Sequence, residues 1–250
     1  MTIRVGYIPY LNMAPFHQGF GPGPIESDGI RFEFHPMSPR ALGLEAEKGA
    51  IDAGAMSLVD YLKLSETFEP VGSFGIGLKC EAQSVLLFSK KPLADLGGTV
   101  AVTDETSTSF RLLQILLEAH YGRTGVRYGR IASSVLFDGD ADALLLIGDE
   151  ALNAKRDGIR GFPVVTDLGQ EWFNWQRLPF VFARWEVRRK LPNETKVIIE
   201  SFIQNSLDSS IVGTEDQQKY WDGFAYKLTP DHQKSISVFT ELLEKMCLTA

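Results

Sequence analysis

Polar side chains stand at the ends of several strand-like segments, and these are the groups that could bind or transform a ligand. Asn12, Ser57 and Ser84 each lie next to such a segment in this 250-residue sequence. An amide can donate to a carboxylate or orient a hydroxyl, and a serine hydroxyl can donate and accept. Asparagine and serine at these places also cap helices and shape turns, and spacing alone favours that simpler role.

Four consecutive hydroxyl side chains precede the amphipathic segment 110–117. They are Thr106, Ser107, Thr108 and Ser109. Free backbone N–H groups and the helix dipole make a helix N-terminus an anion site, which hydroxyl groups reinforce. One hydroxyl is needed to cap the helix, so the other three favour an anion-binding role.

The apolar segment 143–147 ends in Gly148 and Asp149. A glycine there allows a ligand to approach the backbone closely. Asp149 either caps the following helix, which is the simpler role, or accepts a hydrogen bond from a ligand hydroxyl. Arg177 precedes the segment 180–183 and could pair with a carboxylate.

The sequence lacks the motifs that several kinds of binding and catalysis require. The four histidines do not cluster, the two cysteines are far apart, and no nucleophile elbow, Walker loop or dinucleotide fingerprint occurs. We therefore expect no metal, no nucleotide, no other cofactor and no Ser-His-Asp triad.

Composition limits the kinds of molecule that the protein is expected to bind. The formal charge is −7 and the pI about 5.2, so neither a nucleic acid nor an anionic membrane is an expected partner. No apolar run approaches the ~20 residues that span a bilayer. The chain opens without a secretory leader, so we expect a cytoplasmic protein whose partner is a small, anionic organic molecule. The sequence does not determine the oligomeric state.

Apolar periodicity and turn residues predict alternating strands and helices, and hence an α/β protein. The expected strands are 3–8, 32–35, 51–56, 68–76, 84–89, 100–102, 143–147, 164–165 and 180–183. The expected helices are 39–48, 58–64, 110–121, 193–207 and 231–247, with a short one from residue 15.

This alternation predicts two lobes, each a mostly parallel sheet flanked by helices. We expect residues 1–92 to open the first lobe, residues 93–175 to form the second, and residues 176–250 to return to the first and add the C-terminal helices. Ligands of open parallel sheets bind beyond the carboxyl ends of the strands, so a cleft between the lobes is the expected site.

Six segments, in this order, resemble the chorismate dehydratase family of the futalosine route to menaquinone. They are 10–15 (Tyr-Leu-Asn-Met-Ala-Pro), 51–61 (Ile-Asp-Ala-Gly-Ala-Met-Ser-Leu-Val-Asp-Tyr), 84–89 (Ser-Val-Leu-Leu-Phe-Ser), 106–109 (Thr-Ser-Thr-Ser), 146–152 (Leu-Ile-Gly-Asp-Glu-Ala-Leu) and 178–183 (Leu-Pro-Phe-Val-Phe-Ala). The related dihydroxynaphthoate synthases are less similar, because their Ser-Pro-x-Pro-Asn motif is replaced here by Pro-Tyr-Leu-Asn.

The resemblance implies a type II periplasmic-binding-protein-like fold and a carbon–oxygen lyase that removes water from chorismate to give 3-[(1-carboxyvinyl)oxy]benzoate. It implies that Asn12 and Ser84 act at the reacting centre. The residues that it implies for substrate binding are Tyr10, Ser57, Gln83, Thr106, Ser107, Thr108, Ser109, Gly148, Asp149 and Arg177.

The chain departs from the family pattern at two places. Residues 80–83 read Cys-Glu-Ala-Gln where the family has a glycine-containing approach to the Ser-Val segment, and Gln176 and Arg177 replace Thr-Gly before Leu-Pro-Phe. Both changes add bulky polar groups. The alternative function is therefore a non-catalytic solute-binding or sensing protein for a small aromatic carboxylate.

Overall fold

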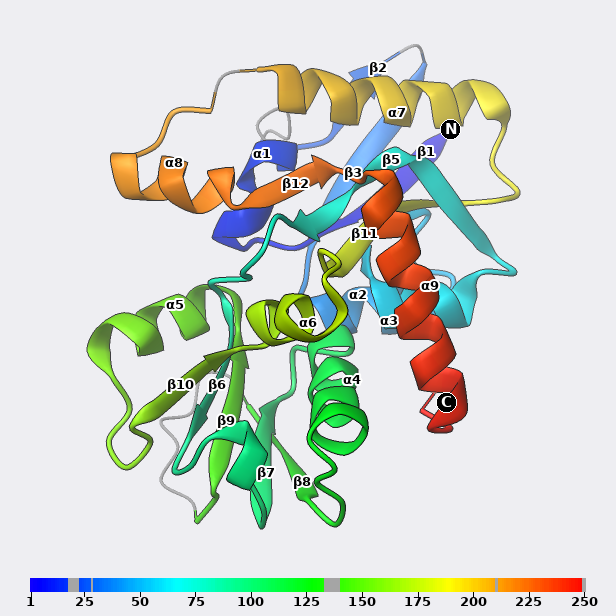
Figure 1. Cartoon of the computed structure of the whole chain (residues 1–250). Coiled ribbons are helices and arrows are strands. Elements are labelled where there is room, and N and C mark those ends of the chain that lie inside the picture. The colour runs from blue at the N-terminus through cyan, green and yellow to red at the C-terminus, as the bar shows by residue number, and fades with distance from the viewer. Residues whose placement is uncertain (18–22, 28, 133–139, 210, 249–250) are drawn as a thin grey trace. The chain divides into compact units, whose positions relative to one another are not determined.

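A computed structural model describes residues 1–17, 23–27, 29–132, 140–209 and 211–248 (Figure 1). The chain divides into two compact units. Unit 1 comprises Met1–Gly77 and Val181–Pro230, and unit 2 comprises Leu78–Phe180 and Asp231–Ala250.

Unit 1 is built on a seven-stranded sheet in the order β12-β5-β11-β4-β1-β3-β2. Its strands are β1 (Thr2–Tyr7), β2 (Ile25–Ser27), β3 (Ile30–Pro36), β4 (Ala53–Ser57), β5 (Phe68–Leu78), β11 (Val181–Arg188) and β12 (Phe224–Lys227). Its helices are the 3-10 helix η1 (Leu11–Met13), α1 (Ala14–His17), α2 (Pro39–Glu47), α3 (Leu58–Leu64), α7 (Asn193–Asp208) and α8 (Glu215–Asp222).

The two faces of this sheet are covered by different helices. Val5 and Trp185 pack under α7, whereas Gly6 and Gly54 face Leu42 of α2. The two glycines are neighbours in register, and a Cβ at Gly54 would lie 2.6 Å from the carbonyl oxygen of Gly6. Both strands therefore lack side chains where α2 packs closest to the sheet.

Unit 2 is built on a five-stranded sheet in the order β10-β6-β9-β7-β8. Its strands are β6 (Val85–Ser89), β7 (Thr99–Thr103), β8 (Arg127–Ile131), β9 (Ala143–Ile147) and β10 (Val164–Asp167). Its helices are the 3-10 helix η2 (Leu93–Asp95), α4 (Thr108–Ile115), the π-helical turn η3 (Leu116–His120), α5 (Gly148–Asp157), α6 (Leu168–Gln176) and α9 (Pro230–Lys245). In this unit α5 covers one face of the sheet, and α4 and α6 cover the other (Figure 1).

Buried apolar side chains hold unit 2 together on both faces. Leu86, Phe88, Leu144 and Leu146 pack with Ala151 of α5 in one cluster. Every residue of β6 and β9 is buried, as their continuous apolar sequences predict.

The α/β class with two helix-flanked sheets is confirmed, but the sheets are mixed instead of mostly parallel. In unit 2 the pairs β7–β8 and β7–β9 are parallel, whereas β6 is antiparallel to β9 and β10. In unit 1 β11 runs antiparallel to β4 and β5. These antiparallel strands stand where the chain passes from one unit to the other, so no crossover helix sets their direction.

The boundaries between the two units fall at other residues than the sequence predicts. The first boundary falls after Gly77 instead of residue 92, because β6 pairs with β9 and β10. The return falls after Phe180 instead of residue 175. Residues 231–250 belong to unit 2, because Ser235 and Phe239 of α9 contact Trp172 of α6.

Several local predictions are confirmed to the residue. The strand 143–147 and the helix 58–64 have the expected bounds. Ser38 accepts a hydrogen bond from the N–H of Ala41 and caps α2, with Pro39 in the first turn. Sequence patterns missed the elements β2, β8, β12, α6 and α8 and gave no range for α5. Of these, β2 and β12 are short, and β8 is mostly exposed.

Candidate functional site

In unit 1 the residues after β1 and β4 share one sheet edge. These strands pair in parallel, with Gly6 opposite Gly54, so their carboxyl ends point the same way. Asn12 lies in η1 just beyond β1, and Ser57 is the last residue of β4. The structure thus brings together two of the residues that the resemblance implies.

The side chain of Asn12 does not cap a helix. Its Oδ1 atom is buried and accepts no hydrogen bond from the described residues. An unpaired buried amide oxygen costs free energy unless a ligand or water supplies a donor. This is the arrangement expected of a ligand-binding amide, and not of a cap.

The main chain around Asn12 is fixed from the C-terminal part of unit 1. Trp221 of α8 donates from Nε1 to the carbonyl of Leu11 at 2.7 Å. The hydroxyl of Tyr226 of β12 donates to the carbonyl of Asn12 at 3.1 Å. Tyr10 precedes η1, and its carbonyl accepts from the N–H of Met13 at 2.9 Å.

Ser57 is 3% exposed and stands directly before α3. Its hydroxyl makes no capping hydrogen bond to that helix. The helix-cap explanation therefore fails for Ser57 as well as for Asn12.

In unit 2 Ser84 and Gly148 are direct neighbours. Their strands are antiparallel, with Val85 opposite Ile147, and the N–H of Gly148 donates to the carbonyl of Ser84 at 2.8 Å. Gly148 has φ +61°, which explains why glycine stands there. Ser84 is 1% exposed, and its Oγ lies 3.4 Å from the carbonyl of Ala82.

The four hydroxyl residues follow β7, the parallel neighbour of β9, at the same edge. Oγ1 of Thr106 accepts from the N–H of Ser109 at 3.2 Å, so this hydroxyl is the one that caps α4. Thr108 and Ser109 lie in the first turn of the helix, which begins two residues earlier than the sequence predicts. Ser107 makes no capping hydrogen bond.

Arg130 holds the loop that carries these hydroxyls, and sequence patterns missed it. Its guanidinium donates to the carbonyls of Thr103 and Thr106 at 2.8 and 2.9 Å, and lies 4.8 Å from the ring centre of Phe110. Arg130 belongs to the polar edge strand β8, whose pattern gave no strand signal.

A carboxyl group of raised pKa lies close to this edge. Glu150 stands in the first turn of α5, and its Oε2 atom is buried without a hydrogen bond from the described residues. Burial, and then the charge of Glu105, raise the pKa of Glu150 to about 7. Near neutral pH this group is therefore partly protonated.

Three further implied residues also lie in unit 2. Asp149 is exposed and does not cap α5, whose N-cap position is Ile147. Arg177 is exposed at the carboxyl end of α6, with a left-handed backbone at φ 57°. Gln83 is half-buried, and its main chain bonds to Asp167 of β10.

Asp167 is a further residue that sequence reasoning missed. Its carboxylate accepts from the N–H groups of Gly169 and Gln170, and also from those of Ala82 and Gln83. An aspartate before an amphipathic nine-residue segment is a helix-start signal and could have revealed the cap. No local signal reveals the bonds to Ala82 and Gln83, which lie more than 80 positions earlier in the sequence.

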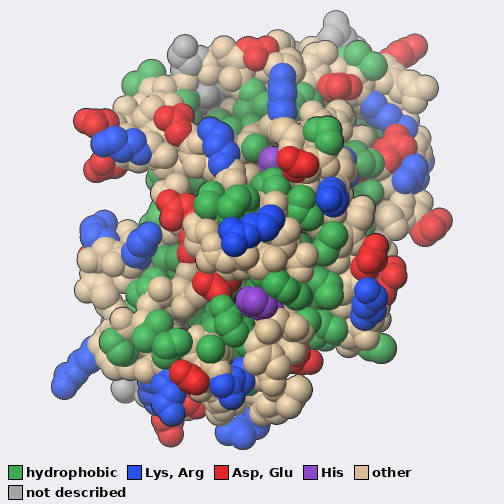
Figure 2. Space-filling model, viewed as in Figure 1, with side chains coloured by type: hydrophobic (Ala, Val, Ile, Leu, Met, Phe, Trp, Pro, Cys, Tyr) green, Lys and Arg blue, Asp and Glu red, His purple; other side chains and the backbone are tan. Residues whose placement is uncertain are grey.

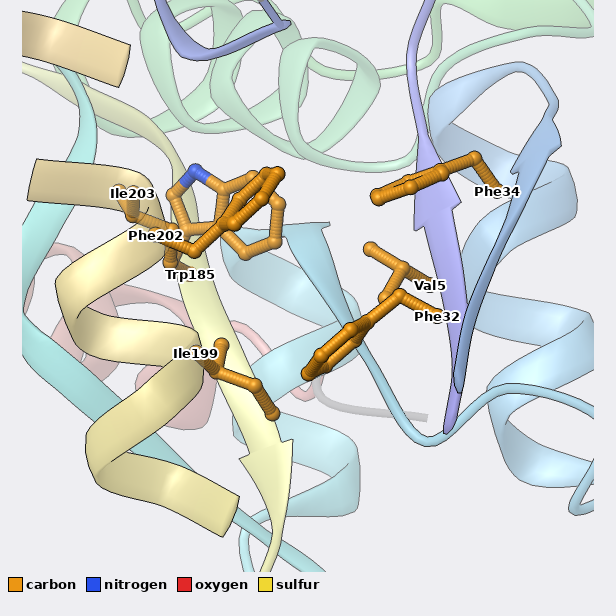
Figure 3. A pocket seen from close by; sticks show the side chains of 7 residues that line it. All are labelled: Val5, Phe32, Phe34, Trp185, Ile199, Phe202 and Ile203. Atoms are coloured by element: carbon orange, nitrogen blue, oxygen red, sulfur yellow. The ribbon is translucent and has the colours of Figure 1, made fainter. Parts of the chain in front are cut away.

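A cavity in unit 1 is not a candidate site. It lies between α7 and the sheet, has a volume of about 10 Å³ and is lined by apolar side chains (Figure 3). Its lining residues are Val5, Phe32, Phe34, Trp185, Ile199, Phe202 and Ile203. It is too small for an organic molecule and offers no polar group to hold one.

The described residues include no group of three His, Cys, Asp or Glu side chains arranged to hold a metal ion. Within the same residues, no helix is long and apolar enough to cross a membrane. On the face that Figure 2 shows, the described acidic and basic side chains are interspersed.

Solved structures share this fold. A protein from Archaeoglobus fulgidus has a TM-score of 0.72 and 16% identity, covering 99% of this chain and 98% of its own. The ligand-binding component of an ABC-type import system from Staphylococcus aureus has a TM-score of 0.65 and 10% identity, covering 99% and 92%. The periplasmic aliphatic sulphonate binding protein from Escherichia coli has a TM-score of 0.58 and 14% identity, covering 99% and 88%. The fold is that of the periplasmic solute-binding proteins.

Sequence comparison identifies the family within that fold. Residues 3–212 match the family model for menaquinone biosynthesis, so the chain belongs to this family. A chorismate dehydratase from Thermus thermophilus is 31% identical over 201 residues, which are 75% of this chain and 70% of that protein.

Proposed function

We propose that this protein is a chorismate dehydratase of the futalosine route to menaquinone, which removes water from chorismate to give 3-[(1-carboxyvinyl)oxy]benzoate. The observation that carries the proposal is the 31% identity to a chorismate dehydratase over 75% of the chain, within a menaquinone-biosynthesis family. The enzyme is then a hydro-lyase. We place it in the cytoplasm, because its family belongs to a biosynthetic route.

The reaction needs little chemistry from the protein. One ring C–H bond and the neighbouring C–OH bond break, a ring C=C bond forms, and the proton and hydroxide leave as water. Because the ring becomes aromatic, the elimination is strongly favoured. A carboxylate of the substrate takes the proton, so the protein's tasks are to orient the substrate, exclude water and assist the departing hydroxide.

Asn12 and Ser84 act at the reacting centre in this proposal. The buried Oδ1 atom of Asn12 accepts no hydrogen bond from the described residues, which leaves it available to a substrate hydroxyl. Ser84 offers a buried hydroxyl that lies 3.4 Å from the Ala82 carbonyl.

The remaining implied residues bind the substrate. Ser57 and the hydroxyls and N–H groups of residues 106–109 hold carboxylates, with Tyr10, Gln83, Gly148 and Asp149 shaping the surroundings. The segment 106–109 supports this assignment, because among the described residues only the hydroxyl of Thr106 accepts a capping hydrogen bond there. Arg177 is exposed and therefore available to pair with a carboxylate.

The test is to incubate purified protein with chorismate and to follow the benzoate product by chromatography. Asn12→Ala should lower kcat by about a hundredfold or more, as expected when one hydrogen-bonding group at a reacting centre is removed. Asn205→Ala, an exposed position on α7, is the control and should keep full activity.

Two results would change the assignment. Equal losses in binding and turnover for Asn12→Ala would leave Asn12 a binding role only. If the wild-type protein converts no chorismate but is stabilised against heating by chorismate or a related aromatic acid, it is a solute-binding protein.

A further inference from the structure

Ser84 follows a tight turn whose backbone is in a rare conformation. The N–H of Ser84 donates to the carbonyl of Ala82 at 2.7 Å, a bond that spans only two residues. Gln83, between them, has φ 61°. A γ-turn with positive φ is rare and strained, particularly for a residue that is not glycine.

One carboxylate holds this turn from another strand. Oδ1 of Asp167 accepts from the N–H of Ala82 at 3.0 Å, and Oδ2 accepts from the N–H of Gln83 at 2.6 Å. Hydrogen bonds to an ionised acceptor are short and strong, and here both N–H groups of the turn point to the same carboxylate. Strained backbone persists where the surrounding structure over-determines it, which is the case here.

The same carboxylate begins α6, but the cap uses only one of its oxygens. Oδ1 accepts from the N–H groups of Gly169 and Gln170 at 2.9 and 3.0 Å. Oδ2 accepts only from Gln83 among the described residues, at the shortest distance of the four. A helix cap by itself does not account for the bond at Oδ2.

The helix and the turn also approach closely. A Cβ at Gly169 would lie 2.2 Å from Cδ1 of Leu78 and 3.0 Å from the backbone nitrogen of Ala82. The N–H of Gly148 fixes the other side of Ser84 by its bond to the Ser84 carbonyl. The backbone of Ser84 is thus held on both sides, which fixes the direction in which its hydroxyl leaves the main chain.

We propose that Asp167 is the positioning residue for Ser84, which it orients through the strained 82–84 turn without touching the substrate. The proposal rests on the function proposed above, in which Ser84 meets the leaving hydroxyl. Misplacing a reacting group by about 1 Å can lower a rate about a hundredfold. Loss of Asp167 is therefore expected to lower kcat, whereas the affinity for chorismate depends on other residues.

Two substitutions separate this role from the helix cap. Asp167→Asn keeps one acceptor oxygen and remains a good capping residue. Its NH₂ group cannot accept a hydrogen bond, so either the helix N-terminus or the turn loses its acceptor. Asp167→Ser can cap α6, but its side chain is too short to reach both N–H groups of the turn as well. Asp157→Asn removes an exposed carboxylate of the same unit and is the matched control.

The expected result is a fall in kcat of about 10- to 100-fold for both Asp167 variants, with KM changed by less than about threefold and the control unchanged. Lower melting temperatures with unchanged kcat would reduce Asp167 to a helix cap and overturn the proposal.

Amide hydrogen exchange tests the turn without reference to activity. The N–H groups of Ala82 and Gln83 should exchange faster in Asp167→Asn than in the wild type or in Asp157→Asn. If the wild-type protein converts no chorismate, the proposed function is wrong. The exchange measurement still tests whether Asp167 binds the N–H groups of the turn. Unchanged exchange at both amides would overturn the proposal in either case.

Discussion

The hydroxyl of Tyr226 donates to the main-chain carbonyl of Asn12 at 3.1 Å, across 214 positions of sequence. Burial, foremost, raises the pKa of Tyr226, so this hydroxyl keeps its proton at neutral pH. The ring of Tyr226 also packs edge-on against Phe16 at a centroid distance of 5.3 Å. A strand near the C-terminus thus fixes the loop that carries the proposed catalytic amide.

Tyr226→Phe removes this bond and keeps the ring. We expect the free energy of unfolding to fall by about 0.5–1.5 kcal/mol, because the Asn12 carbonyl loses a donor. We expect kcat for chorismate to fall as well, because the loop around Asn12 gains freedom. Denaturant unfolding and steady-state kinetics measure the two effects, and a variant that loses stability but keeps full kcat would show that the bond is structural only.

Glu186 lies in the centre of β11 with no exposed surface. Its two carboxyl oxygens accept no hydrogen bond from the described residues, and Nε of Arg184 is 3.7 Å away. Burial is the largest cause that raises the pKa of Glu186, from 4.5 to about 8, against the opposing charge of Arg184. Between these two pH values the folded protein holds a proton that the unfolded chain has lost, so stability falls as pH rises through this window.

Glu186→Gln cannot ionise and should lose this dependence. Below about pH 4.5 the variant and the wild type should be similarly stable, and above about pH 8 the variant should be more stable by at least about 2 kcal/mol. Denaturant unfolding at several pH values measures the difference, with exposed Glu66→Gln as control. Parallel pH profiles for Glu186→Gln and the wild type would contradict a protonated Glu186.

Glu150 should make substrate binding depend on pH. Its pKa is raised to about 7 by burial and then by Glu105, so the group is mostly neutral below pH 7 and becomes negative above it. A negative charge beside the hydroxyl cluster repels an anionic substrate, so KM for chorismate should rise as pH increases through 7.

Glu150→Gln should remove this rise, and Glu105→Gln should move it to lower pH, because one source of repulsion is lost. Measuring KM between pH 6 and about 8.5 tests both expectations, since that interval brackets the titration. If KM of the wild type and of Glu150→Gln follow the same curve, Glu150 lies away from the bound substrate.

Gly54→Ala tests the close packing of β1, β4 and α2. The added methyl group would lie 2.6 Å from the backbone oxygen of Gly6, which cannot move without disturbing the sheet. We expect a loss of about 1–3 kcal/mol in the free energy of unfolding. Gly129→Ala in β8 has nothing within 4 Å of the new methyl group and should change stability by less than about 0.5 kcal/mol.

The sequence by itself determined the α/β class, several element bounds and the segments that follow the strands. The short apolar run 143–147, followed by Gly148, indicates a buried strand, and the Ser38–Pro39 pair is a typical helix start. The motifs around Asn12, Ser84 and residues 106–109 also indicated the family, which the comparison over residues 3–212 confirms.

The tertiary structure decided how those segments are held and which strands are antiparallel. Asp167 and Gln83 lie 84 positions apart, and Tyr226 and Asn12 lie 214 apart, so no local pattern predicts that one bonds to the other. Hydrogen bonds of this kind depend on which strands become neighbours in a sheet. That pairing is set by the packing of the whole unit, since side-chain period and turn residues describe only a few positions at a time.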